Sequence, residues 1–456
     1  MCDSPSNVEV ISLLCCSTAA VAHIQSVVAS LPRMKKLLVI TYYWPPSGGA
    51  GVQRWLKFVK YLAQMGWEIH VITVDDAVAT YPHRDSSLPT TIEGNVTVYR
   101  TSTSEPYRYY SMLSGGKVPS AGFANEATGS SAGLLKRFAR FVRGNAFIPD
   151  PRKGWNSYAI KKAKEIIDAN GIQLVVTTSP PHSTQLIGLE LKKCRDIKWI
   201  ADMRDPWTGI YYASELLQTA WAERQNAKME REVLLTADHI LTVSNQLKRD
   251  FLKLVPDLSA NGISVIPNGY DLDDFKEMMP AQKEFTIGYV GTITGQYDVS
   301  ALVQVLAKMS QKVRLRFIGE VPLDIQTTLK ATGHNCEFTG YLAHDEALQL
   351  ASSCAMLLLV IPKVKGNKGI VTGKIFEYLA LQRPILGIGP VDGDAAEIMK
   401  ETGAGEMVDY EDMERITSVI QAILQNGFSI KRIGAEAYSR FGLSKQLNQI
   451  LVKFSN

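Results

Sequence analysis

The sequence predicts an α/β fold with two doubly wound domains, each built on a parallel sheet. At 456 residues the chain is too long for one ordinary hydrophobic core, and its 46% hydrophobic and 21% charged residues are typical of a globular protein. A strand-like segment, a glycine-rich turn and an amphipathic helix open the pattern near Leu37, and a second strand and glycine turn restart it at Phe285. Such alternation is typical of parallel sheets covered by helices.

Residues 1–33 are expected to form a tail outside the fold. The apolar run of residues 10–22 imitates a signal peptide or short anchor, but Asp3 and Glu9 stand where a signal peptide carries positive charge. The run is also too short to span the roughly 30 Å hydrocarbon core of a bilayer. Met34 and two lysines then lead directly into the first strand, as in many cytoplasmic chains.

The first domain is expected to span residues 34–280. Its first helix has apolar side chains at helical spacing and is followed by Gly66 as a stop signal. These side chains are Val52, Trp55, Leu56, Val59, Leu62 and Ala63. Residues 67–74 then form an apolar run that predicts a buried strand. Three further units of helix and strand follow, with strands at 172–178, 198–202 and 239–244.

The second domain is expected to span residues 281–435. After the strand and turn of residues 285–293, helical spacing predicts a helix at 300–309 and another at 373–381. Its other expected strands are residues 313–319, 336–340, 355–361 and 384–389.

Charge and cysteine content exclude several classes of protein. A net charge of +4 and a pI near 8.5 give no case for a dedicated nucleic-acid binder. The six cysteines form no CxxC pair and have no histidine cluster beside them. We therefore expect a reducing, cytoplasmic setting, no structural zinc and no nucleic-acid partner.

A glycine turn lies where a ligand would bind. In open parallel sheets ligands bind beyond the carboxyl ends of the strands, so two such domains predict a cleft between them. Gly48, Gly49 and Gly51 follow the first strand at that edge, without a GxGxxG spacing or an acidic residue placed for a dinucleotide ribose. The turn alone is equally consistent with a simple strand reversal and with backbone N–H groups that cradle a phosphate.

The segment from Ile361 to Leu386 carries the strongest chemical signal. A lysine-rich loop follows a buried strand, and Lys374 and Glu377 then open an apolar helix. A carboxylate can accept hydrogen bonds from both hydroxyls of a ribose, and a lysine beside a helix N-terminus suits a diphosphate. The alternative is a solvated loop with a capping ion pair. The loop lysines are Lys363, Lys365 and Lys368.

From Met34 to the C-terminus the chain resembles the retaining GT-B glycosyltransferases of family 4, of the type that builds bacterial surface polysaccharides. The resemblance rests on the order of five motifs: YYWPPSGGAGVQR, ADHILTVSNQLKRDF, VIPNGYDLDDF, IGYVGTI and GKIFEYLALQRPIL. It implies two facing Rossmann-like domains, with the acceptor bound by the first and the nucleotide-sugar by the second. It also implies that residues 436–456 form a helix that returns to the first domain.

By this resemblance Glu377 holds the ribose, and Gly48 and Gly49 approach the donor diphosphate. The chain departs from the family pattern at two places. Gly369 stands eight positions before Glu377, where many members have a glutamate, and Thr292 and Gln296 occupy the turn where many carry an arginine and a lysine. We expect Thr292 to lie at the donor site, with Lys374 and the loop lysines supplying the missing positive charge.

Three charged residues, Asp202, Arg204 and Asp205, come directly after a strand of the acceptor half. Family members place an acidic or histidine group in this region near the reacting sugar, which makes Asp202 or Asp205 a catalytic candidate. A structural ion pair is equally consistent with the sequence.

Three other residues are candidates for the acceptor site or the cleft. His182, after two prolines, could bind acceptor or diphosphate or be an ordinary loop residue. Ser244 and Asn268 match the family pattern and could simply shape the cleft.

The resemblance implies transfer of a sugar, with retention, from a nucleotide-diphosphate donor to a glycan or lipid-linked acceptor in surface-polysaccharide synthesis. The alternatives are a nucleotide-sugar 2-epimerase of the same fold and a non-catalytic subunit that binds the nucleotide-sugar. The sequence contains no acidic pair typical of metal ligands, so we expect metal-independent chemistry without a cofactor.

The serine- and glycine-rich residues 103–133 are expected to form a surface insertion, and residues 134–143 a basic amphipathic helix. Its apolar stripe would contain Leu134, Phe138, Phe141 and Val142, and its basic residues are Lys136, Arg137, Arg140 and Arg143. Such a helix suits the inner face of an anionic membrane. A helix packed on its own domain needs the same stripe.

Overall fold

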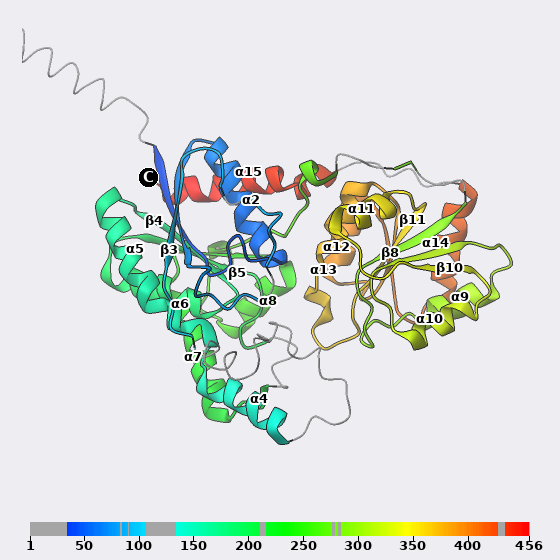
Figure 1. Ribbon diagram of the computed structural model, residues 1–456, viewed down its shortest axis with the longest axis horizontal. Coiled ribbons are helices and arrows are strands. Elements are labelled where there is room, and N and C mark those ends of the chain that lie inside the picture. The colour runs from blue at the N-terminus through cyan, green and yellow to red at the C-terminus, as the bar shows by residue number, and fades with distance from the viewer. Residues whose placement is uncertain are drawn as a thin grey trace, which may run out of the picture.

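The computed structural model describes residues 34–82, 84–89, 91–105, 134–209, 216–275, 279–280, 284–426 and 434–455. It contains two domains, each a parallel sheet covered by helices on both faces (Figure 1). The expected two-domain α/β architecture is thereby confirmed. The expected tail of residues 1–33 and residues 106–133 of the expected insertion lie outside the described residues.

The N-terminal domain has a seven-stranded sheet in the order β3-β2-β1-β4-β5-β6-β7. The strands are β1 (Lys35–Ile40), β2 (Trp67–Val74), β3 (Val96–Thr101), β4 (Leu174–Ser179), β5 (Lys198–Met203), β6 (His239–Thr242) and β7 (Ile263–Val265). The central strand β1 pairs in parallel with β2 on one side and β4 on the other, with Leu38 opposite Val175.

Helices bury both faces of this sheet. They are α2 (Ala50–Gln64), α5 (Asn156–Asn170), α6 (Ser183–Cys194), α7 (Ala220–Thr236) and α8 (Asn245–Leu254). A further helix, α4 (Leu134–Ala146), lies at the outer edge of the domain. Along β1, Leu38 and Ile40 pack in the core with α5 and α6, whereas Leu37 and Val39 pack in the core with α2. Burial on both faces explains why β1 is a continuous apolar run rather than an alternating one.

The C-terminal domain has a six-stranded sheet in the order β10-β9-β8-β11-β12-β13. The strands are β8 (Thr286–Val290), β9 (Arg314–Ile318), β10 (Asn335–Phe338), β11 (Met356–Val360), β12 (Ile385–Ile388) and β13 (Gly405–Val408). The helices are α9 (Ser300–Lys308), α10 (Leu323–Lys330), α11 (His344–Ser352), α12 (Gly373–Leu381), α13 (Asp394–Thr402) and α14 (Met413–Asn426). Helices α9 and α14 cover one face, and α11, α12 and α13 cover the other.

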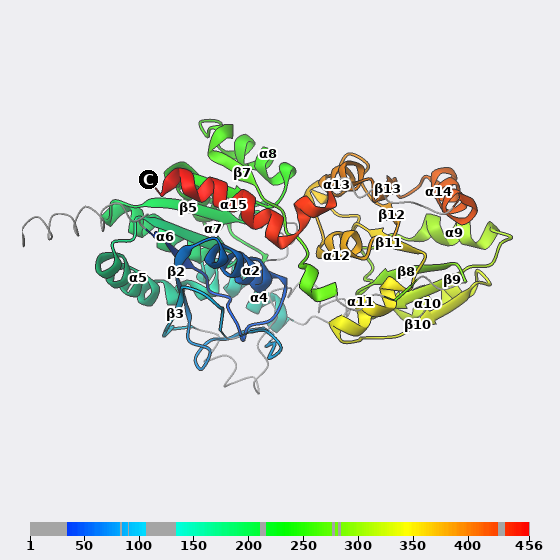
Figure 2. The same ribbon diagram turned by 90° about the horizontal axis from the view of Figure 1, so that it is seen from above.

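The last helix, α15 (Arg440–Phe454), lies on the N-terminal domain beside α2, as both views show (Figures 1 and 2). Leu443, Leu447 and Leu451 are buried in the core that α2 shares with β1. Before this helix the chain passes beside the first interdomain linker, where the Arg440 N–H donates to the Tyr270 carbonyl at 2.7 Å. The two linkers therefore cross the domain boundary side by side.

Short 3₁₀ helices complete the described fold. They are η1 (Pro151–Trp155), η3 (Ala260–Gly262), η4 (Leu272–Phe275), η5 (Asn367–Gly369) and η6 (Ala435–Tyr438).

Candidate functional site

The glycine turn forms the N-terminus of α2 at the carboxyl edge of the first sheet. Gly49 precedes the helix with φ of 99°, a conformation that residues with a side chain rarely adopt. Gly48 lies against Asp85, and a Cβ added at Gly48 would be 3.1 Å from the Cβ of Asp85. No described side chain caps α2. The N–H groups of its first two residues are thus available to an anion, which the helix dipole also favours, whereas the Val52 N–H donates to the Gly49 carbonyl at 3.1 Å.

Arg204 connects the glycine turn to the end of β4. Its Nη1 donates to the Gly51 carbonyl at 2.8 Å, and its Nε donates to the Ser179 carbonyl at 2.8 Å. The side chain is nearly buried, and burial lowers its pKa below the usual value. The guanidinium therefore connects the end of β4 to the glycine turn and adds positive charge beneath it.

Asp202 is a fully buried carboxylate at the end of β5. Arg54 donates to it through Nη2 at 3.0 Å and Nε at 3.2 Å, and Trp55 Nε1 and Thr178 Oγ1 each donate at 2.7 Å. Burial alone would raise the pKa of Asp202, but the positive charges of Arg54 and Arg204 and these hydrogen bonds hold it below its usual value. This surrounding fits the structural ion pair that the sequence left open, rather than contact with a substrate.

Asp205 and His182 lie near Arg204, and both have polar atoms without a hydrogen-bond partner among the described residues. Asp205 is half-buried, no described residue hydrogen-bonds to it, and burial raises its pKa despite the charge of Arg204. The ring of His182 stacks on Trp207 with 5.2 Å between centroids, and burial and Arg204 lower its pKa to about 3. His182 is therefore a neutral imidazole at physiological pH. Of the two aspartates, Asp205 is the one with carboxylate oxygens left for a ligand.

Lys374 opens α12 and packs over the turn that follows β8. Its Nζ donates to the hydroxyl of Tyr289 at 2.6 Å and lies 4.4 Å and 5.3 Å from the ring centroids of Tyr289 and Tyr297. Gly291 has φ of 110°, and a Cβ there would be 2.7 Å from Cε of Lys374, so glycine is required for this approach. The Tyr289 hydroxyl donates in turn to the Thr292 carbonyl at 3.2 Å, while the Thr292 side chain is exposed.

The ammonium of Lys374 has no carboxylate within ion-pair distance among the described residues. Burial lowers the pKa of Lys374 to about 8, although the nearby charge of Glu377 opposes the shift. A partly buried cation without a counterion is destabilised, and a bound anion would relieve this.

Glu377 lies one helical turn after Lys374 on α12 and is also half-buried. No described residue hydrogen-bonds to its carboxylate, and burial raises its pKa even though His344 and Lys374 act in the opposite direction. Asp274, which adds to the rise, belongs to η4 and pairs with Lys57 of α2 at 3.5 Å. Both oxygens of Glu377 thus remain available to hydroxyl donors.

Two of the three loop lysines pair with other carboxylates, whereas Lys365 is exposed and has no ion pair among the described residues. Lys363 pairs with Asp298 and Glu411 at 3.3 and 3.1 Å, and Lys368 pairs with Asp392 at the surface. These ion pairs already neutralise the two ammonium groups. Lys374 is therefore the lysine of this segment that the structure places at the start of α12 with Glu377.

Gly369 stands where many family members have a glutamate, and the structure gives a physical reason. A Cβ at Gly369 would be 3.0 Å from Cβ and 3.2 Å from Cγ of Gln246, which belongs to α8 of the other domain. A side chain at this position would therefore require Gln246 to shift by a few tenths of an ångström. Ser244 begins α8 as its cap, accepting from the Leu247 N–H at 3.2 Å, and Asn268 has a buried Oδ1 without a partner among the described residues.

The two domains touch beside this position. Oδ2 of Asp394 on α13 accepts from the backbone N–H of Gln246 at 2.8 Å, and Asn245 donates to Glu397 at 3.1 Å. A carboxylate from one domain thus satisfies a free N–H at the helix N-terminus of the other. This contact joins the domains on the side of the crossing linkers.

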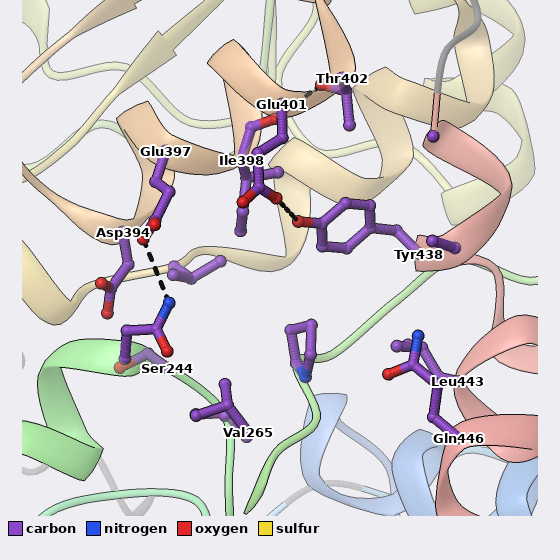
Figure 3. Close-up of a pocket in the computed structure, with 16 residues that line it drawn as sticks. Ser244, Val265, Asp394, Glu397, Ile398, Glu401, Thr402, Tyr438, Leu443 and Gln446 are labelled. Atoms are coloured by element: carbon purple, nitrogen blue, oxygen red, sulfur yellow. Dashed lines mark hydrogen bonds between the residues drawn. The ribbon is translucent and has the colours of Figure 1, made fainter.

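A cavity of about 410 Å³ lies between the domains next to this contact (Figure 3). Asp394, Glu397 and Glu401 of α13 line one side, and Glu401 accepts a hydrogen bond from Tyr438 at 2.7 Å. Among the described residues that line it there is no lysine or arginine, and neither Lys374 nor Glu377 lines it. These three carboxylates would repel an anion such as a diphosphate.

Several residues of the region escaped the sequence interpretation. Arg54, Tyr289 and Asp394 belong to local patterns that are equally typical of solvated helices and buried strands. One feature of the sequence could have identified Arg54, the last residue of the YYWPPSGGAGVQR motif. It lies on the apolar stripe of α2, and a charged side chain in the core requires a partner.

The described residues contain no group of three or more His, Cys, Asp and Glu side chains that could hold a metal ion. Among the described helices, none combines the length and apolar content needed to cross a bilayer.

Comparison with known proteins gives two family matches and a set of related folds. Residues 120–274 match the model of Glycosyltransferase Family 4, and residues 284–426 match that of Glycosyl transferases group 1. The chain is 22% identical over 324 residues to alpha-maltose-1-phosphate synthase of Mycobacterium tuberculosis, a match that covers 63% of this chain and 80% of that protein.

Solved structures of similar fold include HepE of Anabaena in complex with UDP, with a TM-score of 0.57 and 13% identity over 92% of this chain and 100% of that one. Another is the lipopolysaccharide outer core galactosyltransferase WaaB, with a TM-score of 0.55 and 12% identity over 92% of this chain and 99% of that one. Two segments of the chain thus each match a glycosyltransferase family model, and its two Rossmann-like domains have the GT-B fold of these solved structures.

Proposed function

We propose that this glycosyltransferase takes its sugar from a nucleotide-diphosphate donor and transfers it, with retention at the anomeric carbon, to a glycan or lipid-linked acceptor. The observation that carries the proposal is the pair Lys374 and Glu377, one turn apart on α12, each half-buried and without an opposite charge within ion-pair distance among the described residues. A ribose and a diphosphate would satisfy both groups at once. The UDP complex of the similar Anabaena structure supports a nucleotide as the ligand.

In the proposed reaction the bond between the anomeric carbon and the diphosphate oxygen breaks, and the acceptor oxygen forms the new bond on the same face. The diphosphate leaves with the electron pair of the broken bond and takes up the proton that the acceptor hydroxyl loses. Negative charge grows on the departing diphosphate. Lys374 and the N–H groups at the start of α2 would stabilise that charge, since both are fixed before the reaction begins. Asp205, with its free carboxylate oxygens, would stabilise positive charge on the sugar or orient the acceptor.

The proposed acceptor class rests on a solved structure of similar fold. The similar structure WaaB is named for the outer core of lipopolysaccharide, a lipid-linked glycan of the cell surface. We propose the same kind of acceptor here and place surface-polysaccharide synthesis as its setting.

A panel of labelled nucleotide-sugars tests the function, with and without a membrane extract that supplies acceptors. We expect one donor to lose its sugar to a larger product only when extract is present, with the anomeric configuration retained by NMR. An epimerised donor without transfer would indicate the 2-epimerase, and donor binding without turnover would indicate a non-catalytic subunit. Inversion at the anomeric carbon would contradict the proposed retention but not the proposed sugar transfer.

Glu377→Ala is expected to weaken nucleotide binding without unfolding the protein. Each charge-assisted hydrogen bond to a ribose hydroxyl contributes roughly 1.5–3 kcal/mol, so we expect at least a tenfold rise in the Kd for UDP or GDP. Calorimetry measures this, and uridine or guanosine without phosphates should be affected in parallel because the contact is to the ribose. Unchanged affinity would remove Glu377 from the donor site.

Transfer is expected to continue in the presence of EDTA. Lys374 and backbone N–H groups would neutralise the diphosphate in place of a divalent cation. The measurement is the initial rate with the identified donor before and after chelation. A rate abolished by EDTA and restored by magnesium or manganese would show that a metal ion stabilises the leaving group.

A further inference from the structure

Helix α4 and the segment that leads into α7 are joined into one surface unit, although 70 residues or more separate them in the sequence. Asn145 donates from Nδ2 to the Leu217 carbonyl at 3.1 Å and accepts at Oδ1 from the Thr219 N–H at 2.7 Å. Gly144 allows this approach, because a Cβ there would be 2.3 Å from the Leu216 carbonyl oxygen. Figure 1 shows α4 at the outer edge of the N-terminal domain, with the start of α7 beside it.

Three large apolar side chains are exposed around this joint. Phe141 of α4 is 42% exposed, Leu217 is 39% exposed, and Trp221 in the first turn of α7 is 54% exposed. Phe141 lies one helical turn before Asn145, and Trp221 lies two residues after Thr219, so the hydrogen bonds of Asn145 hold the two backbone segments that carry these three side chains next to each other. Trp221 was not part of the expected amphipathic helix, and only the fold places it here.

Positive charge surrounds these apolar groups. Arg137 is exposed and Arg140 half-exposed on α4, and Arg224 and Lys228 are exposed on α7, with Glu223 as the exposed acidic residue in the first turn of α7. Within the side chains that the structure describes, this basic-apolar surface thus carries an excess of cations around a tryptophan, a phenylalanine and a leucine.

We propose that this basic-apolar surface docks on an anionic phospholipid bilayer and holds the protein there without spanning it. Exposed aromatic and aliphatic groups gain by entering the acyl boundary, while arginines and lysine beside them pair with anionic headgroups. The positive charge of this surface favours a bilayer over a second copy of the chain. In a contact between two copies, the same basic residues would face and repel each other. The inference goes beyond the proposed function, since it concerns lipid alone and requires neither donor nor acceptor.

The test is sedimentation of the full-length protein with vesicles of equal parts phosphatidylglycerol and phosphatidylcholine, and with vesicles of phosphatidylcholine alone. Binding is expected to the anionic vesicles and to weaken with added salt, because screening shortens the reach of the headgroup charge. The double variant Arg137→Glu/Arg140→Glu should bind roughly thirtyfold more weakly or worse, and Trp221→Ser several-fold more weakly.

Leu235→Ser is the matched control, since Leu235 is 46% exposed at the other end of α7, about 21 Å from Trp221 along the helix. It should bind like the unaltered protein, and thermal unfolding checks that all variants are folded. The proposal would be overturned if the protein bound neither kind of vesicle. It would also be overturned if the folded double variant and Trp221→Ser bound as well as the unaltered protein. So would dimerisation in gel filtration that Trp221→Ser abolishes, since the surface would then bind a second copy. None of these outcomes depends on sugar transfer.

Discussion

Lys374→Gln is expected to slow sugar transfer by about a hundredfold or more, because it removes a fixed positive charge from the departing diphosphate. Glutamine is uncharged and one bond shorter than lysine, but it keeps a polar group that can face the Tyr289 hydroxyl. Steady-state kinetics with the identified donor measures the effect as a loss in kcat/KM. The matched control is Lys368→Gln in the preceding loop, whose ammonium pairs with Asp392 at the surface and should leave the rate unchanged.

The same lysine predicts the pH dependence of nucleotide binding. With a pKa of about 8 in the free protein, Lys374 is charged below that pH and loses its proton as the pH rises through it. Affinity for UDP or GDP should therefore be constant below about pH 7 and fall above pH 8, and the fall should be absent in Lys374→Gln. An equally steep fall in the variant would assign the proton to another group.

Asp202→Ala is expected to lower the free energy of unfolding by roughly 3–5 kcal/mol, since removing one partner of a buried ion pair leaves the other charge uncompensated. Arg54, with a fully buried side chain, would lose both of its bonds to the carboxylate. Denaturant unfolding measures the loss. Asp168→Ala removes an ion pair of similar geometry to Arg195, but an exposed one, and should change stability little.

The pH dependence of this contribution has a definite sign. Because the pKa of Asp202 in the folded protein lies below its usual value of 3.8, the stabilisation is complete above that value and is lost as the pH falls below it. An Asp202→Ala variant as stable as the unaltered protein, yet inactive, would contradict the structural role and restore Asp202 as a catalytic candidate.

Asp205→Asn should instead retain the fold and lose activity.

The fold was largely predictable because its central strands are buried on both faces. Continuous apolar runs such as those of β1 and β11 can be recognised in the sequence without tertiary information. The strands absent from the prediction, β3, β7 and β13, all lie at sheet edges. Edge strands are short or half-exposed, so their sequences carry neither a long apolar run nor a strict alternation.

The sequence by itself determined the two-domain α/β architecture, the glycine turn at the first strand and the Lys374–Glu377 pair, because each depends on residues close together in the chain. Only the tertiary structure decided that Asp202 is enclosed by Arg54, that Asp205 is left with free oxygens, and that Trp221 joins α4 in one surface. These distinctions depend on side chains that are distant in the sequence. A carboxylate at the end of a strand can meet a guanidinium or a substrate, and which of the two it meets is set by how the helices pack around it.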